Sequence, residues 1–171
     1  MRRIMDGLSS YSKPPRADAV PLDVRDRLTS THDLVAYAAR NQGMTVEVDV
    51  PDDLPPILGE RSEMMQILIN LATNAIEAME SGGRLQLRVR LDPPAVVIEV
   101  EDSGPGIPPE KMAAIWEPFH TTKPEGTGLG LSIVRGLVDK RPGATIGVRS
   151  VPGAGATFTL RMPAQAGPES S

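Results

Sequence analysis

The chain has 171 residues, a formal net charge of −4 and no cysteine. This length fits one domain with a sizeable core, and the lack of cysteine excludes disulfides and thiolate metal sites. The chain has no long run of Lys or Arg, so nucleic acid is a poor candidate for a partner. No apolar run approaches the length of a membrane span, and none forms a signal peptide.

The predicted elements begin with one or two helical turns within residues 1–13, which a pair of prolines ends. Residues 24–41 follow as an amphipathic helix that stops at Gly43. Its predicted apolar positions are Val24, Leu28, Leu34, Val35 and Ala38. Residues 45–50 alternate and predict a strand, and residues 51–59, rich in Pro and Asp, predict a loop.

Residues 60–80 form the clearest helix of the sequence, and it has two faces. The apolar stripe at helical spacing consists of Met64, Ile67, Leu68, Leu71, Ala75, Ile76 and Met79. Steps of three or four residues bring side chains into line on a helix. A polar face therefore collects Gln66, Asn70, Asn74 and Glu77.

The rest of the chain predicts four strands and two helices. Residues 84–91 and 95–101 alternate and predict a hairpin. Further along the chain we expect a short helix at 109–115, a second strong helix at 129–140, and strands at 144–151 and 156–162. Residues 164–171 predict a disordered tail.

The presence of two asparagines within a strong helix suggests a functional role, because Asn is a mediocre helix former. Amide oxygens are neutral, hard ligands that suit Mg²⁺, which takes its other ligands from water and phosphates. Asn70, Asn74 and Glu77 are therefore candidates for a metal–phosphate site. The alternative is a solvated face or a hydrogen bond between elements.

Asp102 ends an apolar strand and opens a turn with Gly104 and Gly106. A carboxylate at a strand end can accept a hydrogen bond from the exocyclic amine of adenine. The glycines allow the backbone to approach the flat base, and one of them can take a positive φ. The alternative is an ordinary Asp-X-Gly turn.

The segment Gly126-Thr-Gly-Leu-Gly130-Leu-Ser runs directly into a predicted helix. Free N–H groups and the helix dipole at such a terminus bind phosphate oxygens. The spacing matches neither a Rossmann fingerprint nor a P-loop. A flexible hinge is the alternative, but the position before a strong helix argues against it.

In these motifs the chain resembles the catalytic ATP-binding domain of two-component sensor histidine kinases, within the wider group that includes DNA gyrase, the heat-shock chaperone and mismatch-repair ATPases. The resemblance covers roughly residues 33–163. Besides the three motifs it includes a phenylalanine box at 116–123 and a final Gly153-Ala-Gly155-Ala-Thr157-Phe. The residues in these motifs are most similar to those of the nitrogen-regulator-sensor type.

This resemblance implies an α+β fold, a two-layer α/β sandwich of the Bergerat type with a mixed, mostly antiparallel sheet and helices on one face. A mobile lid would span about 104–127. Residues 1–13 would be the remnant of a dimerisation helix, 14–163 the catalytic domain and 164–171 the tail. The implied domain is cytoplasmic and monomeric in isolation.

The resemblance also implies the site residues, with ATP and Mg²⁺ as cofactors. Asn74 and Asn70 would be the metal ligands, with Asn70 and Lys123 as catalytic residues. Asp102 would hold adenine directly and Thr157 through water, while Phe119 anchors the lid. The implied nucleotide-binding residues are Asn74, Glu77, Asp102, Gly104, Gly106, Ile107, Phe119, Thr127, Gly128, Leu129, Gly130 and Thr157.

Related ATPases have Glu where this chain has Asn70, and an amide cannot take a proton from water. The implied reaction is therefore transfer of the γ-phosphate to a histidine of a separate dimerisation domain, and then indirectly to a response-regulator receiver domain. Neither His32 nor His120 lies where such an acceptor belongs. An anti-sigma-type serine kinase and a nucleotide-sensing interaction module remain as alternatives.

Overall fold

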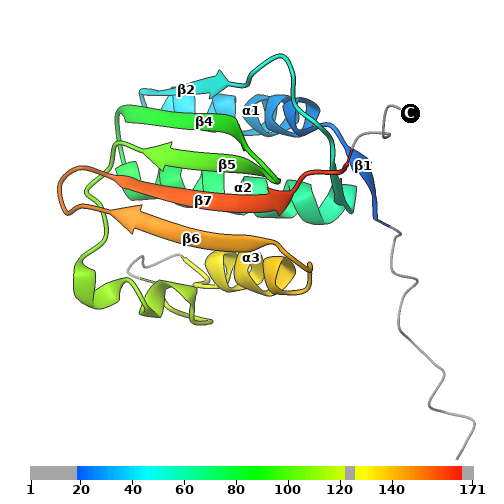
Figure 1. Cartoon of the computed structure of the whole chain (residues 1–171). Helices are drawn as coiled ribbons and strands as arrows, with labels where there is room; N and C mark the ends of the chain where they lie inside the picture. The colour runs from blue at the N-terminus through cyan, green and yellow to red at the C-terminus, as the bar shows by residue number, and fades with distance from the viewer. Residues whose placement is uncertain (1–18, 122–125, 167–171) are drawn as a thin grey trace, which may run out of the picture.

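The computed structural model describes residues 19–121 and 126–166. They form two layers, a five-stranded sheet and three α-helices that lie along one of its faces (Figure 1). The helices are α1 (Val24–Asn41), α2 (Arg61–Met79) and α3 (Gly130–Asp139), with 3₁₀ turns η1 (Pro109–Lys111) and η2 (Ala114–Trp116). The strands are β1 (Val20–Leu22), β2 (Met44–Asp49), β3 (Ile57–Gly59), β4 (Gly83–Asp92), β5 (Ala95–Asp102), β6 (Thr145–Ser150) and β7 (Ala156–Pro163).

The main sheet has the strand order β2-β4-β5-β7-β6. Only the β2–β4 pair is parallel, and the other three pairs are antiparallel. A mixed, mostly antiparallel sheet with helices on one face is the predicted α+β sandwich, and the prediction is confirmed. The hairpin predicted around Pro93 and Pro94 is also present as β4 and β5.

The core lies between the helices and the inner face of the sheet. All seven residues of the predicted apolar stripe of α2 are buried. They face β-strand residues such as Leu87, Ile98 and Phe158, which are at most 1% exposed. The buried residues of α2 are distributed along the helix, so the packing fixes its rotation relative to the sheet. The polar face of α2 is therefore held in one orientation along its whole length.

The predicted apolar face of α1 is partly wrong. Leu34 is 62% exposed and Ala38 is also exposed, whereas Thr31 and Ala39 are completely buried. Thr31 satisfies its hydroxyl by donating a hydrogen bond to the carbonyl of Arg27 at 2.8 Å. A threonine with its polar group bonded locally can therefore enter the core, and the buried face is rotated from the predicted one.

Several element boundaries differ from the predictions. The loop expected at 51–59 contains β3, which pairs with β1 in a small second sheet that was not predicted. The helix expected at 109–115 is two 3₁₀ turns. The tail expected from residue 164 starts later, since Ala164 bridges Ile57 and Gln165 donates to the carbonyl of Pro56. The predicted remnant at 1–13 lies outside the described residues.

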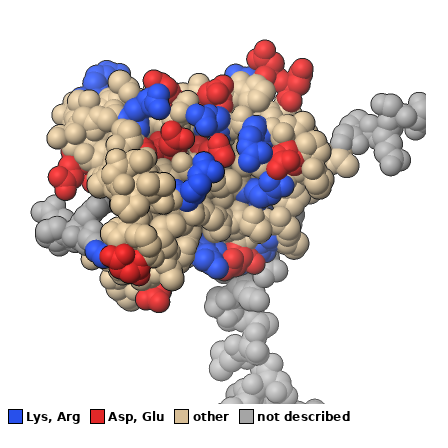
Figure 2. Space-filling model, turned by 60° about the vertical axis from the view of Figure 1, so that its left-hand side comes forward, with Lys and Arg blue, Asp and Glu red and all other residues tan. Residues whose placement is uncertain are grey.

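Charged side chains on the outer face of the sheet are arranged in pairs. Arg88 lies 3.6 Å from Glu99 and 3.9 Å from Glu101 and Asp49. Arg161 donates to Asp92 at 2.5 Å, which lowers the pKa of that carboxyl below its ordinary value. Basic and acidic side chains are accordingly interspersed on the face shown in Figure 2. Among the described residues, no helix is long and apolar enough to cross a membrane.

The carboxylate of Glu60 caps the N-terminus of α2. It accepts hydrogen bonds from the hydroxyl and N–H of Ser62 and from the N–H of Glu63, and these bonds lower its pKa from the ordinary value of 4.5. Glu60→Ala should therefore reduce the free energy of unfolding by about 1 kcal/mol at neutral pH. Because the folded-state pKa is depressed, the stabilisation is present above the unfolded-state pKa and is lost as pH falls. Urea unfolding at several pH values should show the wild-type advantage shrinking below about pH 4.5.

Candidate functional site

Asn70 connects the polar face of α2 to the start of α3. Its amide nitrogen donates a hydrogen bond to the carbonyl of Gly130 at 3.4 Å, across 60 residues of sequence. The first and third motifs are thereby brought together. The bond uses the nitrogen of the amide, so the oxygen is the atom that Asn70 can offer to a ligand.

Asp102 lies at the end of β5 and is only 4% exposed. One of its oxygens accepts a hydrogen bond from the N–H of Gly104 at 2.8 Å. A Cβ at Gly104 would come within 3.3 Å of Met79 and 3.5 Å of the carbonyl of Ala78. The Asp102 turn therefore packs against the C-terminal end of α2.

These contacts order the motifs along α2. The Asp102 turn meets the helix at Ala78 and Met79, Asn74 follows one turn earlier, and Asn70 meets the N-terminus of α3. Ala78 lies eight positions after Asn70 on the helix, which corresponds to about 12 Å at 1.5 Å per residue. A buried carboxylate at one end and amides beside a helix N-terminus at the other suit an elongated ligand with a base and a phosphate chain.

The second glycine box lies against the phenylalanine box. Gly128 has φ +68°, and a Cβ there would lie 2.5 Å from the carbonyl carbon of Phe119 and 2.7 Å from the nitrogen of His120. Thr127 accepts a weak hydrogen bond from the N–H of Leu129 at 3.4 Å, and α3 has no side-chain cap. The first N–H groups of α3 are thus not blocked by a capping side chain, as phosphate binding requires.

Ser150 supports the first glycine box and was not predicted. Its hydroxyl accepts a hydrogen bond from the N–H of Ile107 and donates one to the carbonyl of Gly155, both at 2.8 Å. The N–H of Gly153 also donates to the carbonyl of Pro105 at 2.6 Å. The loop after Asp102 is therefore attached to the β6–β7 turn. A serine at the end of an edge strand has no sequence pattern that could have indicated this role.

Gly155 is where the backbone of that turn crosses Asp102. It has φ +81°, and a Cβ would lie 1.9 Å from the carbonyl oxygen of Asp102. Gly155→Ala should therefore lower the free energy of unfolding by at least about 2 kcal/mol, through strain and displacement of the β5 end. Urea unfolding would measure this. Gly147→Ala in β6 is the matched control, since its Cβ would meet nothing within 4 Å; equal losses would contradict the close approach at Gly155.

The structure does not place Thr157 directly opposite Asp102. Thr157 pairs with Glu101 and Arg149, whereas the residue opposite Asp102 on β7 is Ala156. Successive side chains of a strand point to opposite faces. Thr157 therefore points to the face of the sheet opposite the one to which Asp102 points, and the strand register does not bring these two side chains together.

Phe119 does not anchor the lid segment in this structure. Its side chain is 77% exposed and its φ is +64°. Trp116 performs the anchoring instead, with its ring edge-on to Phe158 at 5.8 Å and the guanidinium of Arg135 5.5 Å from its centre. The segment is thus attached to both β7 and α3. Trp116 could have been singled out, because it is the one tryptophan of an aromatic-poor chain.

The other predicted site residues have mixed positions. Asn74 is half-buried on α2, and Glu77 is exposed near the C-terminal end of the same face. Lys123 lies outside the described residues. Within the two described stretches, no three His, Asp or Glu side chains are grouped as a metal site. Asn70 and Asn74 offer amide oxygens, which Mg²⁺ accepts as ligands.

The arrangement agrees with a known family. The family model described as "Histidine kinase-, DNA gyrase B-, and HSP90-like ATPase" matches residues 59–166, which hold α2, Asp102 and both glycine boxes. The chain belongs to this family. ATP binding by this domain follows from the family, and the matched stretch contains the three motifs that the structure brings together.

Curated relatives are sensor kinases. Sensor histidine kinase ZraS of Escherichia coli (strain K12) is 34% identical over 163 residues, covering 95% of this chain and 35% of that protein. Sensor kinase CckA of Brucella abortus (strain 2308) is 40% identical over 175 residues, covering 91% and 18%. The chain thus spans roughly a third or less of the length of these relatives.

Solved structures of histidine kinases have the same fold. The nucleotide-free catalytic domain of ThkA superposes with a TM-score of 0.78 at 28% identity, covering 86% of this chain and 96% of that one. Full-length ShkA in complex with AMPPNP gives 0.78 at 32% identity, covering 87% and 32%. ThkA in complex with the response regulator TrrA gives 0.74 at 26% identity, covering 86% and 42%.

Proposed function

We propose that this chain is the catalytic domain of a sensor histidine kinase and transfers the γ-phosphate of MgATP to a histidine on a separate dimerisation domain. The observation that carries the proposal is the alignment along α2, with Asp102 at one end and the Asn70–Gly130 contact towards the other. A cytoplasmic location is part of the proposal, because the cytoplasm supplies the ATP. A response regulator is the indirect partner of this domain, and the complex of the related kinase ThkA with the response regulator TrrA supports this part of the proposal.

Each part of the site has a defined task in this proposal. Asp102 accepts a hydrogen bond from the adenine amine, and the N-terminus of α3 binds phosphate oxygens. Asn74 and Asn70 would hold Mg²⁺ by their amide oxygens, and the ion would neutralise charge on the phosphates. The donor set fits this cation, because hard neutral oxygens lie on the helix face that meets α3.

Asn70 also determines which reaction the site favours. An amide can orient a water molecule but cannot accept its proton, so hydrolysis lacks a general base at this position. Phosphoryl transfer depends chiefly on positioning and on neutralisation of charge. The site is therefore suited to hold ATP intact until a protein nucleophile approaches the phosphate end.

The alternatives are less well supported. An anti-sigma-type serine kinase would share the fold, but the relatives described above are named as sensor kinases. A nucleotide-sensing module without transfer would use the same ATP site, and the transfer experiment below separates it, because it would label no hairpin. The chemistry of the phosphoprotein separates the first alternative, because phosphohistidine is acid-labile and phosphoserine is not.

The proposal is tested by adding a dimerisation hairpin in trans with γ-labelled ATP. Acid-labile label should accumulate slowly on the hairpin, because the tether that raises effective concentration to roughly millimolar is missing. The domain alone should acquire almost no label. The variants His32→Gln and His120→Gln are controls for self-labelling. In the structure the ring of His32, on α1, is hydrogen-bonded to the carboxylate of Asp33 at 3.1 Å. Acid-stable label, or label on His32 or His120 without the hairpin, would contradict the proposal.

A further inference from the structure

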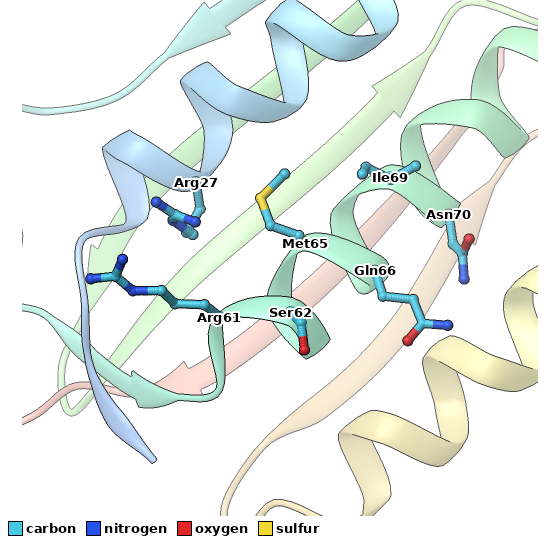
Figure 3. A pocket seen from close by; sticks show the side chains of 7 residues that line it. All are labelled: Arg27, Arg61, Ser62, Met65, Gln66, Ile69 and Asn70. Carbon is cyan, nitrogen blue, oxygen red and sulfur yellow. The ribbon is translucent and has the colours of Figure 1, made fainter. Parts of the chain in front are cut away.

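An open groove lies between α1 and the N-terminal half of α2 (Figure 3). Its volume is about 570 Å³, and it is lined by Arg27, Arg61, Ser62, Met65, Gln66, Ile69 and Asn70. Only Asn70 belongs to the nucleotide site described above. The groove therefore begins at the phosphate end of that site and continues away from Asp102 along α2.

Two arginines at one end of the groove make no ion pair with any residue that the structure describes. In Figure 3 the side chains of Arg27 and Arg61 extend from α1 and α2 towards the same region. Within the described part of the chain neither guanidinium makes an ion pair, whereas Arg25 pairs with Asp52 and Arg141 with Glu63. The nearby carboxylate of Glu60 is already occupied as the cap of α2.

The wall between the arginines and Asn70 is apolar. Met65 and Ile69 are one helical turn apart on α2 and are half-buried. Methionine adapts its shape to an incoming apolar side chain. A small inorganic anion would pair with the arginines but would leave this surface uncovered, so the combination fits a polypeptide with acidic and apolar side chains.

We propose that this groove docks an acidic, amphipathic segment of the protein that carries the phosphoacceptor. The proposal rests on the proposed function and adds the docking surface. Asn70 lies nine positions after Arg61 on α2, a distance of about 14 Å along the helix. A segment with carboxylates at Arg27 and Arg61 and apolar side chains at Met65 and Ile69 would therefore extend to the phosphate end. Charge pairing at the distant end would orient the partner and accelerate its association.

The test is binding of the dimerisation hairpin to the ADP-loaded domain, measured by calorimetry. The double variant Arg27→Glu/Arg61→Glu should bind the hairpin at least tenfold more weakly and retain its affinity for ADP. The double variant Arg40→Glu/Arg149→Glu changes the net charge equally at exposed positions outside the groove. It should bind the hairpin like the wild type. A hairpin with its acidic residues changed to lysine should recover binding to the first variant.

Three results would overturn the docking surface. In the first, the groove variant binds the hairpin with the affinity of the wild type. In the second, the control variant loses as much affinity for the hairpin as the groove variant does. In the third, the groove variant also loses affinity for ADP, which would place the arginines in the nucleotide site. Failure of the proposed function has a different signature. In that case the hairpin would still bind through the groove, but no acid-labile label would be transferred to it.

Discussion

Asp102→Asn is expected to weaken binding of ATP and ADP by roughly 10- to 100-fold, the loss of a charged hydrogen bond of about 1.5–3 kcal/mol. The carboxylate is nearly completely buried and one oxygen is already used by the N–H of Gly104. The amide oxygen of the asparagine can still accept the hydrogen bond from the N–H of Gly104. Its NH₂ group would then replace the second carboxylate oxygen, which is the proposed acceptor for the adenine amine. Calorimetry with ADP at constant Mg²⁺ would measure the loss.

A comparison of GTP with ATP provides the control for the Asp102→Asn variant. Guanine presents a carbonyl where adenine presents an amine, so the wild type should bind GTP much more weakly than ATP. In Asp102→Asn that preference should shrink or reverse, because the amide can donate. Equal affinity of the wild type for the two nucleotides, or unchanged ADP affinity in the variant, would show that Asp102 serves only the turn to Gly104.

Asn74→Ala should remove the Mg²⁺-dependent part of ATP binding, a loss of roughly tenfold or about 1.4 kcal/mol. The side chain lies on the polar face of α2, between the Asp102 turn and Asn70. Loss of a metal ligand should leave the base pocket intact, so affinity in EDTA should change little. Titrations with and without Mg²⁺ would separate the two contributions.

Asn74→Asp is the matched comparison, since a carboxylate keeps an oxygen ligand at the same position and can retain the metal. Thermal unfolding without nucleotide should be similar for both variants, because Asn74 is only half-buried. An unchanged Mg²⁺ dependence in Asn74→Ala would mean that the polar face of α2 has another role.

The sequence was sufficient to predict the two faces of α2, because helical periodicity depends only on local spacing and one stripe provides the core. It also predicted a nucleotide site formed by the α2 asparagines, the Asp102 turn and the glycine boxes, since such motifs are local backbone requirements. The structure brings two of these motifs together at Asn70 and Gly130.

Only the tertiary structure decided how separate elements meet. Strand register placed Ala156, and not Thr157, opposite Asp102, and a shift of one residue reverses the face of a side chain. Packing selected Trp116 over Phe119 as the anchor. The groove that holds Arg27 and Arg61 arises because α1 and α2 lie side by side. Contacts between residues distant in sequence depend on the packing of whole elements, which local propensity and motif spacing do not determine.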